Sequence, residues 1–219
     1  MKKLLLVSAI GLAGLAAAPA FAESTFNGAA VTGSAATARL DFSVVIPQVL
    51  FLRVGTSSGN TATDGTINGI AFTPTAVNVG TGAAVAATAA SGDLTNGAVT
   101  VRVYGNAPGN ISLNSATTGA LSNGVAGQTI PWSQITVAPA ALAAPTAGYT
   151  VGAVAHPAFN LAAGGGAGTA VALVPTAGVV RVEGRWTFSY ANTNVVPAGT
   201  YGTNTAGRNG RVTYTATQL

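Results

Sequence analysis

Apolar and polar side chains alternate in short runs along the chain, and the clearest run covers Val179 to Tyr190. Its apolar positions are Val180, Val182, Trp186, Phe188 and Tyr190. Because successive side chains of a strand point to opposite faces, this alternation predicts a strand with one buried and one solvated face. Arg181, Glu183 and Arg185 share the second face and are predicted to lie in solvent. Gly184 falls among the apolar positions, which indicates either a bulge or a gap that a neighbouring side chain fills.

The most apolar stretch after the first 22 residues runs from Leu40 to Val54. Its first half has alternating apolar residues at Leu40, Phe42, Val44 and Ile46. Its second half, Val49 to Leu52, is apolar without alternation, which predicts burial on both faces. Pro47 separates the halves and cannot donate a ladder hydrogen bond, so it predicts a bend where the strand passes from one sheet to another. This stretch therefore indicates two packed sheets.

The segment from Ala98 to Leu113 predicts a hairpin. The expected inward residues are Val99, Val101 and Val103, and the expected outward ones are Thr100, Arg102 and Tyr104. Residues 106–110, Asn-Ala-Pro-Gly-Asn, have the composition of a turn. Ile111 and Leu113 then start a second strand.

The remaining chain is divided by its 29 glycines and 10 prolines into short β-rich segments. Further strands are expected at Thr129 to Val137, Thr169 to Val174 and Gly210 to Ala216, with a flexible loop at Ala162 to Gly168. Gly82 to Ala90 is rich in alanine, but its interleaved Val and Thr favour a strand or loop over a helix. The sequence thus predicts an all-β fold, an antiparallel immunoglobulin-like or jelly-roll β-sandwich.

Residues 1–22 have the three parts of a secretory signal peptide. Lys2 and Lys3 form a basic start, Leu4 to Ala18 is apolar, and Ala20-Phe21-Ala22 is a small-x-small cleavage site. The apolar run is broken by glycines and is shorter than the ~20 residues of a spanning helix, which favours a cleaved signal over an anchor. We expect export through the inner membrane, passage through the periplasm, and an extracellular or cell-surface location.

Residues 38–219 are expected to form a single β-sandwich domain. Residues 23–37 are small and have only Phe26 and Val31 as apolar anchors, so they predict either a weak edge strand or an N-terminal extension outside the domain. An extended terminal segment can complete the sheet of a neighbouring subunit by strand addition.

Charged residues make up only 6% of the chain, whereas ~25% is typical of soluble domains. The weak charge repulsion favours self-association, although a biased composition alone could also produce such a surface. There is no cysteine, which excludes disulfides and thiolate metal sites. The arginines are scattered rather than clustered, so nucleic acid is not an expected partner.

Few residues are suited to catalysis. The single histidine, His156, is expected to be a surface or packing residue. The carboxylates considered as a glycosidase pair are Asp41, Asp64, Asp93 and Glu183, beside Glu23 at the expected new terminus. Asp64 and Asp93 lie in turn contexts where aspartate stabilises the backbone, and a calcium site built from loop oxygens stays open. We predict no catalytic, cofactor-binding or metal-binding residues, and no enzyme activity.

The two tryptophans and a glycine run are further candidates for binding a ligand. Trp132 and Trp186 would stack on a sugar ring if exposed, but alternating strands usually place tryptophan in the core. Residues 164–166 are a glycine run that lacks the strand and helix of a nucleotide-binding loop.

Two parts of the chain carry a family resemblance. Residues 195–201, Val-Val-Pro-Ala-Gly-Thr-Tyr, lead to residues 210–216, Gly-Arg-Val-Thr-Tyr-Thr-Ala. Together with residues 40–47, Leu-Asp-Phe-Ser-Val-Val-Ile-Pro, this closing hairpin resembles bacterial pilin-like and spore-coat-U-like exported β-sandwich proteins. The resemblance implies a surface or fibre subunit assembled by strand exchange.

The expected function is that of a structural subunit of an extracellular filament, pilus or cell-surface layer. Its expected partners are copies of itself or related surface subunits, and an export or assembly chaperone. The alternative is a secreted or surface adhesin or carbohydrate-binding module, and a hydrolase using a carboxylate pair is a third hypothesis.

Overall fold

The computed structural model describes residues 24–28, 31–57, 63–144 and 146–219. The predicted signal peptide, residues 1–22, and the expected first mature residue, Glu23, lie outside the described residues. The chain divides into two units, one ending at Ile46 and the other beginning at Pro47.

The first unit has no strand or helix among its described residues, and every one of them is exposed. One side-chain hydrogen bond there joins the Thr25 hydroxyl to the Thr37 carbonyl oxygen at 2.8 Å. The strand predicted for the first half of residues 40–54 is therefore wrong. Alternation shows that one face of a segment suits burial, but a strand also needs a neighbour with which to pair.

The second unit is built around β11 (Val180–Tyr190), the longest strand, which confirms the strand predicted there. β11 pairs antiparallel with β3 (Ala98–Gly105) on one side and with β7 (Ile135–Ala140) on the other. β1 (Leu50–Val54) pairs antiparallel with β3. Two short strands complete this six-stranded sheet: β2 (Val85–Ala86), which is antiparallel to β11, and β8 (Thr150–Val151), which is parallel to it.

The second sheet has four strands centred on β4 (Ile111–Thr117). β12 (Val212–Gln218), β10 (Val171–Leu173) and β9 (Gly166–Ala167) all pair antiparallel with β4. A separate two-stranded ribbon joins β5 (Leu121–Ser122) to β6 (Thr129–Ile130). The helices are the 3-10 turns η1 (Ala76–Asn78) and η2 (Trp132–Gln134), and within the described ranges no helix is long and apolar enough to span a bilayer.

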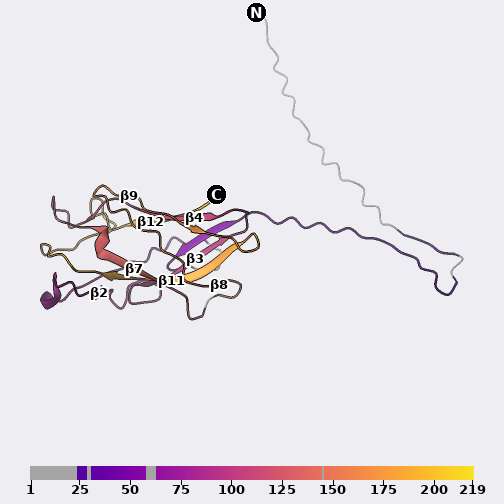
Figure 1. Ribbon diagram of the computed structural model, residues 1–219, viewed down its shortest axis with the longest axis horizontal. Coiled ribbons are helices and arrows are strands. Elements are labelled where there is room, and N and C mark those ends of the chain that lie inside the picture. Colours follow the sequence, from indigo (N-terminus) through magenta and orange to yellow (C-terminus); the bar gives the residue numbers. More distant parts are fainter. Residues whose placement is uncertain (1–23, 29–30, 58–62, 145) are drawn as a thin grey trace, which may run out of the picture. The chain divides into compact units, whose positions relative to one another are not determined.

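One hydrophobic core joins the two sheets. Its buried residues are Val99, Val101 and Val103 of β3, Ile111 and Leu113 of β4, Val154, and Val180, Trp186 and Phe188 of β11. Figure 1 shows β4, β9 and β12 on one side of this unit, with β3, β7 and β11 on the other. The predicted all-β fold with antiparallel sheets is confirmed.

The predicted hairpin over residues 98–113 is wrong, because β3 and β4 belong to different sheets. The turn at residues 106–110 carries the chain across the core instead of folding it back within one sheet. Val103 and Ile111 both point into the core, as the alternation indicated. Alternation fixes which side chains face inward, but it is the same for strands that pair and for strands that cross between sheets.

Several weaker predictions are also corrected. β1 is half-buried instead of buried on both faces. Among the described strands it has a partner on one side only. The strand predicted over residues 129–137 is interrupted by η2, and the loop predicted over residues 162–168 contains β9. The strands expected near residues 169–174 and 210–216 are present as β10 and β12.

Candidate functional site

The first candidate feature is residues 40–46, called here the exposed segment, and above all its apolar side chains. Leu40, Phe42, Val44 and Ile46 are exposed at 74%, 86%, 83% and 77% of their surface. The residues between them are Asp41, Ser43 and Val45. If the segment is extended, its two faces are therefore an apolar row of four side chains and a mixed row that carries one charge.

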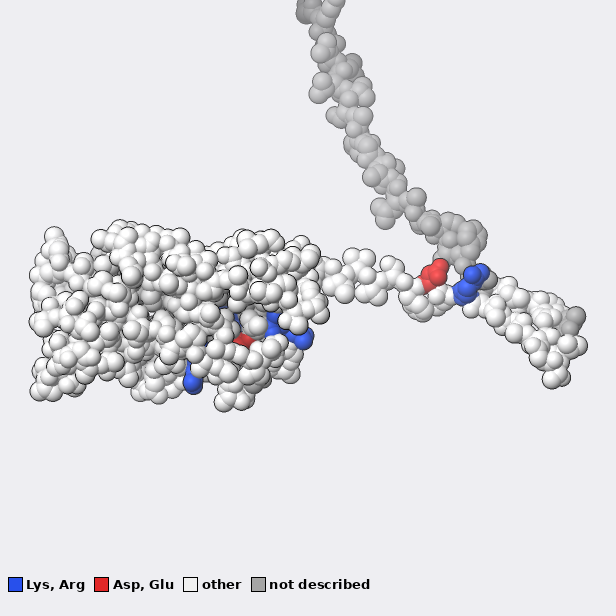
Figure 2. Space-filling view, in the orientation of Figure 1, with Lys and Arg blue, Asp and Glu red and all other residues white. Residues whose placement is uncertain are grey.

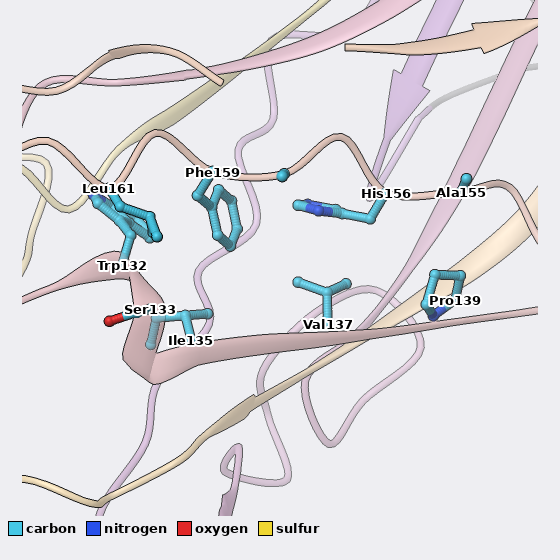
Figure 3. Close-up of a pocket in the computed structure, with 10 residues that line it drawn as sticks. Trp132, Ser133, Ile135, Val137, Pro139, Ala155, His156, Phe159 and Leu161 are labelled. Atoms are coloured by element: carbon cyan, nitrogen blue, oxygen red, sulfur yellow. The ribbon is translucent and has the colours of Figure 1, made fainter. Parts of the chain in front are cut away.

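The second candidate feature is a hollow of about 430 Å³ beside β7, called here the β7 groove. It is lined by Trp132, Ser133, Ile135, Val137, Pro139, Ala155, His156, Ala158, Phe159 and Leu161. Figure 3 shows the β7 residues Ile135, Val137 and Pro139 along one wall, facing residues 155–161 across the groove. None of the lining side chains is an acid, a lysine or an arginine, so the groove suits an apolar occupant.

Residues 155–161 are held by the four-stranded sheet. The Ser115 hydroxyl of β4 lies 3.0 Å from the Ala158 carbonyl oxygen, to which it donates, and Ala158 also forms a bridge to Thr169. Because β7 belongs to the six-stranded sheet, the groove lies between the margins of the two sheets.

His156 belongs to the wall of the β7 groove formed by residues 155–161 and is packed among aromatic rings. Its ring centroid lies 4.5 Å from that of Trp186 and 4.7 Å from that of Phe159, in edge-to-face geometry. Nε2 lies 2.8 Å from the Tyr214 hydroxyl of β12. Burial lowers the pKa of His156 to about 4 and raises that of the Tyr214 hydroxyl, so His156 is neutral at physiological pH.

The solvated face predicted for Arg181, Glu183 and Arg185 is wrong at its centre, because only 1% of the Glu183 surface is exposed. Arg102, predicted to face outward, is 2% exposed and pairs with Glu183. Residue Thr146 closes the cluster, since its backbone N–H donates to Glu183 Oε2 at 2.6 Å. Because both charges of this pair are buried and occupied with each other, we assign the pair a structural role.

One further group, the Tyr149 ring, completes the environment of the ion pair. The Tyr149 ring lies against the Arg102 guanidinium, 4.6 Å from ring centroid to Cζ. Burial alone would raise the pKa of the Glu183 carboxyl, but the hydrogen bonds from Thr146 and Arg102 and the arginine charge outweigh it and hold that pKa below its ordinary value.

The described carboxylates Asp93 and Asp64 have hydrogen-bond partners close to them in the sequence. Asp93 accepts from the Thr100 backbone N–H at 2.9 Å and forms an ion pair with Arg53. Asp64 accepts from the Thr66 N–H at 2.8 Å, as expected for a turn aspartate. Asp41 is exposed in the first unit. In the part of the chain that the structure describes, no three His, Cys, Asp or Glu residues gather as metal ligands.

Both tryptophans are buried, as the alternation favoured. Trp132 is 6% exposed and donates from Nε1 to the Gly119 carbonyl at 2.7 Å. Trp186 is 0% exposed and donates to the Val154 carbonyl at 2.7 Å. Trp186 presents no face for stacking on a sugar, and the small exposed part of Trp132 lies at the β7 groove, so neither ring offers the open platform expected of the carbohydrate-binding alternative.

The two glycine features have structural explanations. A Cβ at Gly184 would lie 2.8 Å from the Gly152 carbonyl oxygen, so the glycine admits the close approach of residues 152–154. Gly165 has a φ of +73°, and a Cβ there would lie 2.4 Å from the Thr117 carbonyl oxygen of β4.

Comparisons with protein families, with curated proteins and with solved structures find no match to this chain. The functional interpretation of the candidate site therefore rests on the geometry of the site alone. Sequence reasoning missed the β7 groove, although Ile135, Val137 and Pro139 carried a signal for it. Their i, i+2, i+4 spacing is that of one strand face, and a proline in a strand indicates a sheet edge.

Proposed function

We propose that this protein is a structural subunit of an extracellular filament, pilus or cell-surface layer, and that it self-associates by strand exchange. The observation that supports this most strongly is the exposed segment, whose four large apolar side chains lie on one parity and outside any sheet. The pattern has the features of a strand, but the segment has no strand partner among the described residues.

The free energy available from covering this apolar face is large. Burial of one large aliphatic or aromatic side chain is worth about 1.5–3 kcal/mol, and the exposed segment carries four of them. Contiguous exposed apolar surface on a soluble protein marks an interaction site. Residues 40–46 are therefore suited to bind another protein surface as an added strand.

The sparse charge of the chain supports assembly from many identical copies. In Figure 2 only a few acidic and basic side chains are visible on the face shown. Charges are 6% of the sequence, so repulsion between identical copies is weak. Many copies can then pack closely without a large electrostatic cost.

We propose that the two sheets form a β-sandwich of immunoglobulin-like or jelly-roll type, and that residues 1–22 direct export to the cell surface. The resemblance of residues 40–47, 195–201 and 210–216 to pilin-like and spore-coat-U-like proteins supports the same proposal.

Negative-stain electron microscopy of the purified chain beginning at Glu23, and of cells that produce it, tests the proposal. Regular filaments or a surface layer are the expected result. Dispersed monomers at all concentrations, with bare cells, would contradict it and would favour the adhesin or binding-module alternative.

A further inference from the structure

We infer that the β7 groove of one subunit receives residues 40–46 of a second copy as a strand added to β7. The inference rests on the proposed function and names the acceptor surface for strand exchange. It connects the two candidate features, each of which is incomplete by itself.

β7 offers a free backbone edge. Among the described strands it pairs only with β11, over Ile135–Ala140, and no described strand lies on its other side. Thr136 and Ala138 are exposed, whereas Ile135 and Val137 are half-buried at the groove. Pro139 has no N–H to donate, which is compatible with an edge strand and limits an added strand to pairing mainly over residues 135–138.

The spacing of the groove matches that of the exposed segment. Ile135, Val137 and Pro139 present apolar side chains at every second residue along one wall (Figure 3). Phe42, Val44 and Ile46 have the same period of two, and rows of this kind interdigitate when strands lie side by side. Asp41 is on the opposite parity and would point away from the groove.

The chemistry of the groove also fits this occupant. Its lining includes the rings of Trp132, His156 and Phe159, and the Trp132 and Phe159 centroids are 4.9 Å apart. His156 is neutral because its pKa is lowered by burial. An uncharged aromatic lining favours large apolar side chains such as Phe42 over a polar peptide.

The edge at β1 is a poorer acceptor. The hollow beside β1, of about 320 Å³, is lined in part by Arg53 and Asp64 and by the hydroxyls of Thr56, Thr63 and Thr66. An apolar row placed there would lie against polar groups and would deprive them of water. The β7 groove has only Ser133, His156 and the Trp132 N–H as polar side-chain groups in its lining, so this desolvation cost is smaller there.

Strand register indicates that a segment with Ile46 on β7 comes from a second copy. β1 and β7 are separated by β3 and β11, so they are three strand spacings, about 14 Å, apart. Leu50 is level with Val180, and the nearest β7 residue, Ala140, is level with Arg185, about 17 Å further along the sheet.

The chain is too short to bridge that separation near its anchor. Ile46 is four residues from Leu50 and can lie no more than about 14 Å from it. The chain after it is also fixed, because the Val49 N–H donates to the Asn106 side-chain oxygen at 2.7 Å and the Asn106 amide donates to the Pro47 carbonyl at 2.8 Å. Ile46 therefore cannot lie along β7 of its own domain, whereas the same residue of a second copy can.

Because the chain has no cysteine, disulfide trapping between separate copies tests the inference. One population carries Val44→Cys, and a second, of different size through a tag, carries a cysteine at Ile135, Val137 or Pro139 in turn. The populations are mixed under assembly conditions and oxidised. The matched control replaces Val44→Cys by Val45→Cys, since Val45 is equally apolar and exposed but lies on the opposite parity.

The expected result is a mixed-size disulfide dimer at one or more of the three β7 positions, at least fivefold more abundant with Val44→Cys than with Val45→Cys. Assembly without any β7 cross-link, but with a cross-link from Val44→Cys to Leu50→Cys of β1, would overturn the inference and keep strand exchange. A chain carrying Val44→Cys and Val137→Cys that cross-links only within itself would also overturn it. Absence of any assembly by the parent chain would instead refute the proposed function.

Discussion

Arg102 of β3 and Glu183 of β11 are register partners in neighbouring strands, and the ion pair between their side chains is almost completely buried. Arg102 Nε donates to Glu183 Oε1 at 2.8 Å. The pair therefore ties together the two central strands of the six-stranded sheet at a place where neither charge has access to bulk water.

Removal of one partner should be far more damaging than removal of both. Glu183→Ala leaves the Arg102 guanidinium buried without its counter-charge and should destabilise the fold by about 3–5 kcal/mol. The double variant Arg102→Met/Glu183→Leu should recover most of that loss. Urea denaturation of the single and double variants measures this, and equal losses in Glu183→Ala and the double variant would contradict it.

Acid should weaken the protein through His156. The pKa of His156 is lowered to about 4 in the folded chain, whereas an unfolded histidine titrates near 6.5. The unfolded chain therefore binds this proton first, and stability should fall as pH drops from about 6.5 to 4, by up to about 3 kcal/mol. Denaturation midpoints across this range measure the loss.

His156→Gln is the control for this pH effect, because glutamine does not titrate but can still hydrogen-bond the Tyr214 hydroxyl. Its stability should be nearly flat between pH 6.5 and 5. Glu183 acts in a lower window: its pKa is held below the ordinary value, so its stabilisation is lost only as pH falls below the pKa of an unfolded carboxyl. An unchanged slope in His156→Gln would show that another group carries the effect.

Gly184 should not tolerate a side chain. A Cβ there would lie 2.8 Å from the Gly152 carbonyl oxygen and 3.0 Å from the Val154 backbone nitrogen, and neither backbone atom can move without shifting its loop. Gly184→Ala should cost about 1–3 kcal/mol. Gly152→Ala is the matched control, since its Cβ would have nothing within 4 Å. Equal thermal midpoints for the two variants would rule out this close approach.

Asn106 should determine how firmly the start of β1 is held. Asn106→Ala removes the hydrogen bonds to Val49 and Pro47 and should cost about 1–2 kcal/mol. Amide exchange at Val49 and Leu50 should accelerate at least tenfold, while Val101 in the buried β3 should change much less. Uniform acceleration across both strands would point to global destabilisation instead of local release.

The sequence predicted the all-β class and the inward residues of β3 and β11 correctly, because alternation follows directly from strand geometry. It misplaced Glu183 on a wet face, since a buried ion pair needs a partner from a strand 81 residues away that no local pattern reveals. It placed residues 40–46 in a sheet because their pattern is that of a strand.

The β7 groove could not be predicted in the same way. Its walls come from β7 and from residues 155–161, which the fold brings together from different sheets. Alternation over Ile135, Val137 and Pro139 identifies one wall, but it cannot show that the facing wall stands apart and leaves a hollow. Topology decides that, and the hairpin wrongly expected between β3 and β4 shows how weakly local pattern constrains topology.

In the proposed assembly, the apolar face of residues 40–46 drives self-association. Sedimentation velocity of Val44→Asp against Val45→Asp tests it most directly, because the two valines are adjacent, both highly exposed and on opposite faces of the segment. Val44→Asp should shift the mass distribution to monomer, with assembly weakened at least tenfold, while Val45→Asp should still assemble. Equal assembly by both variants, or equal loss in both, would contradict the claim.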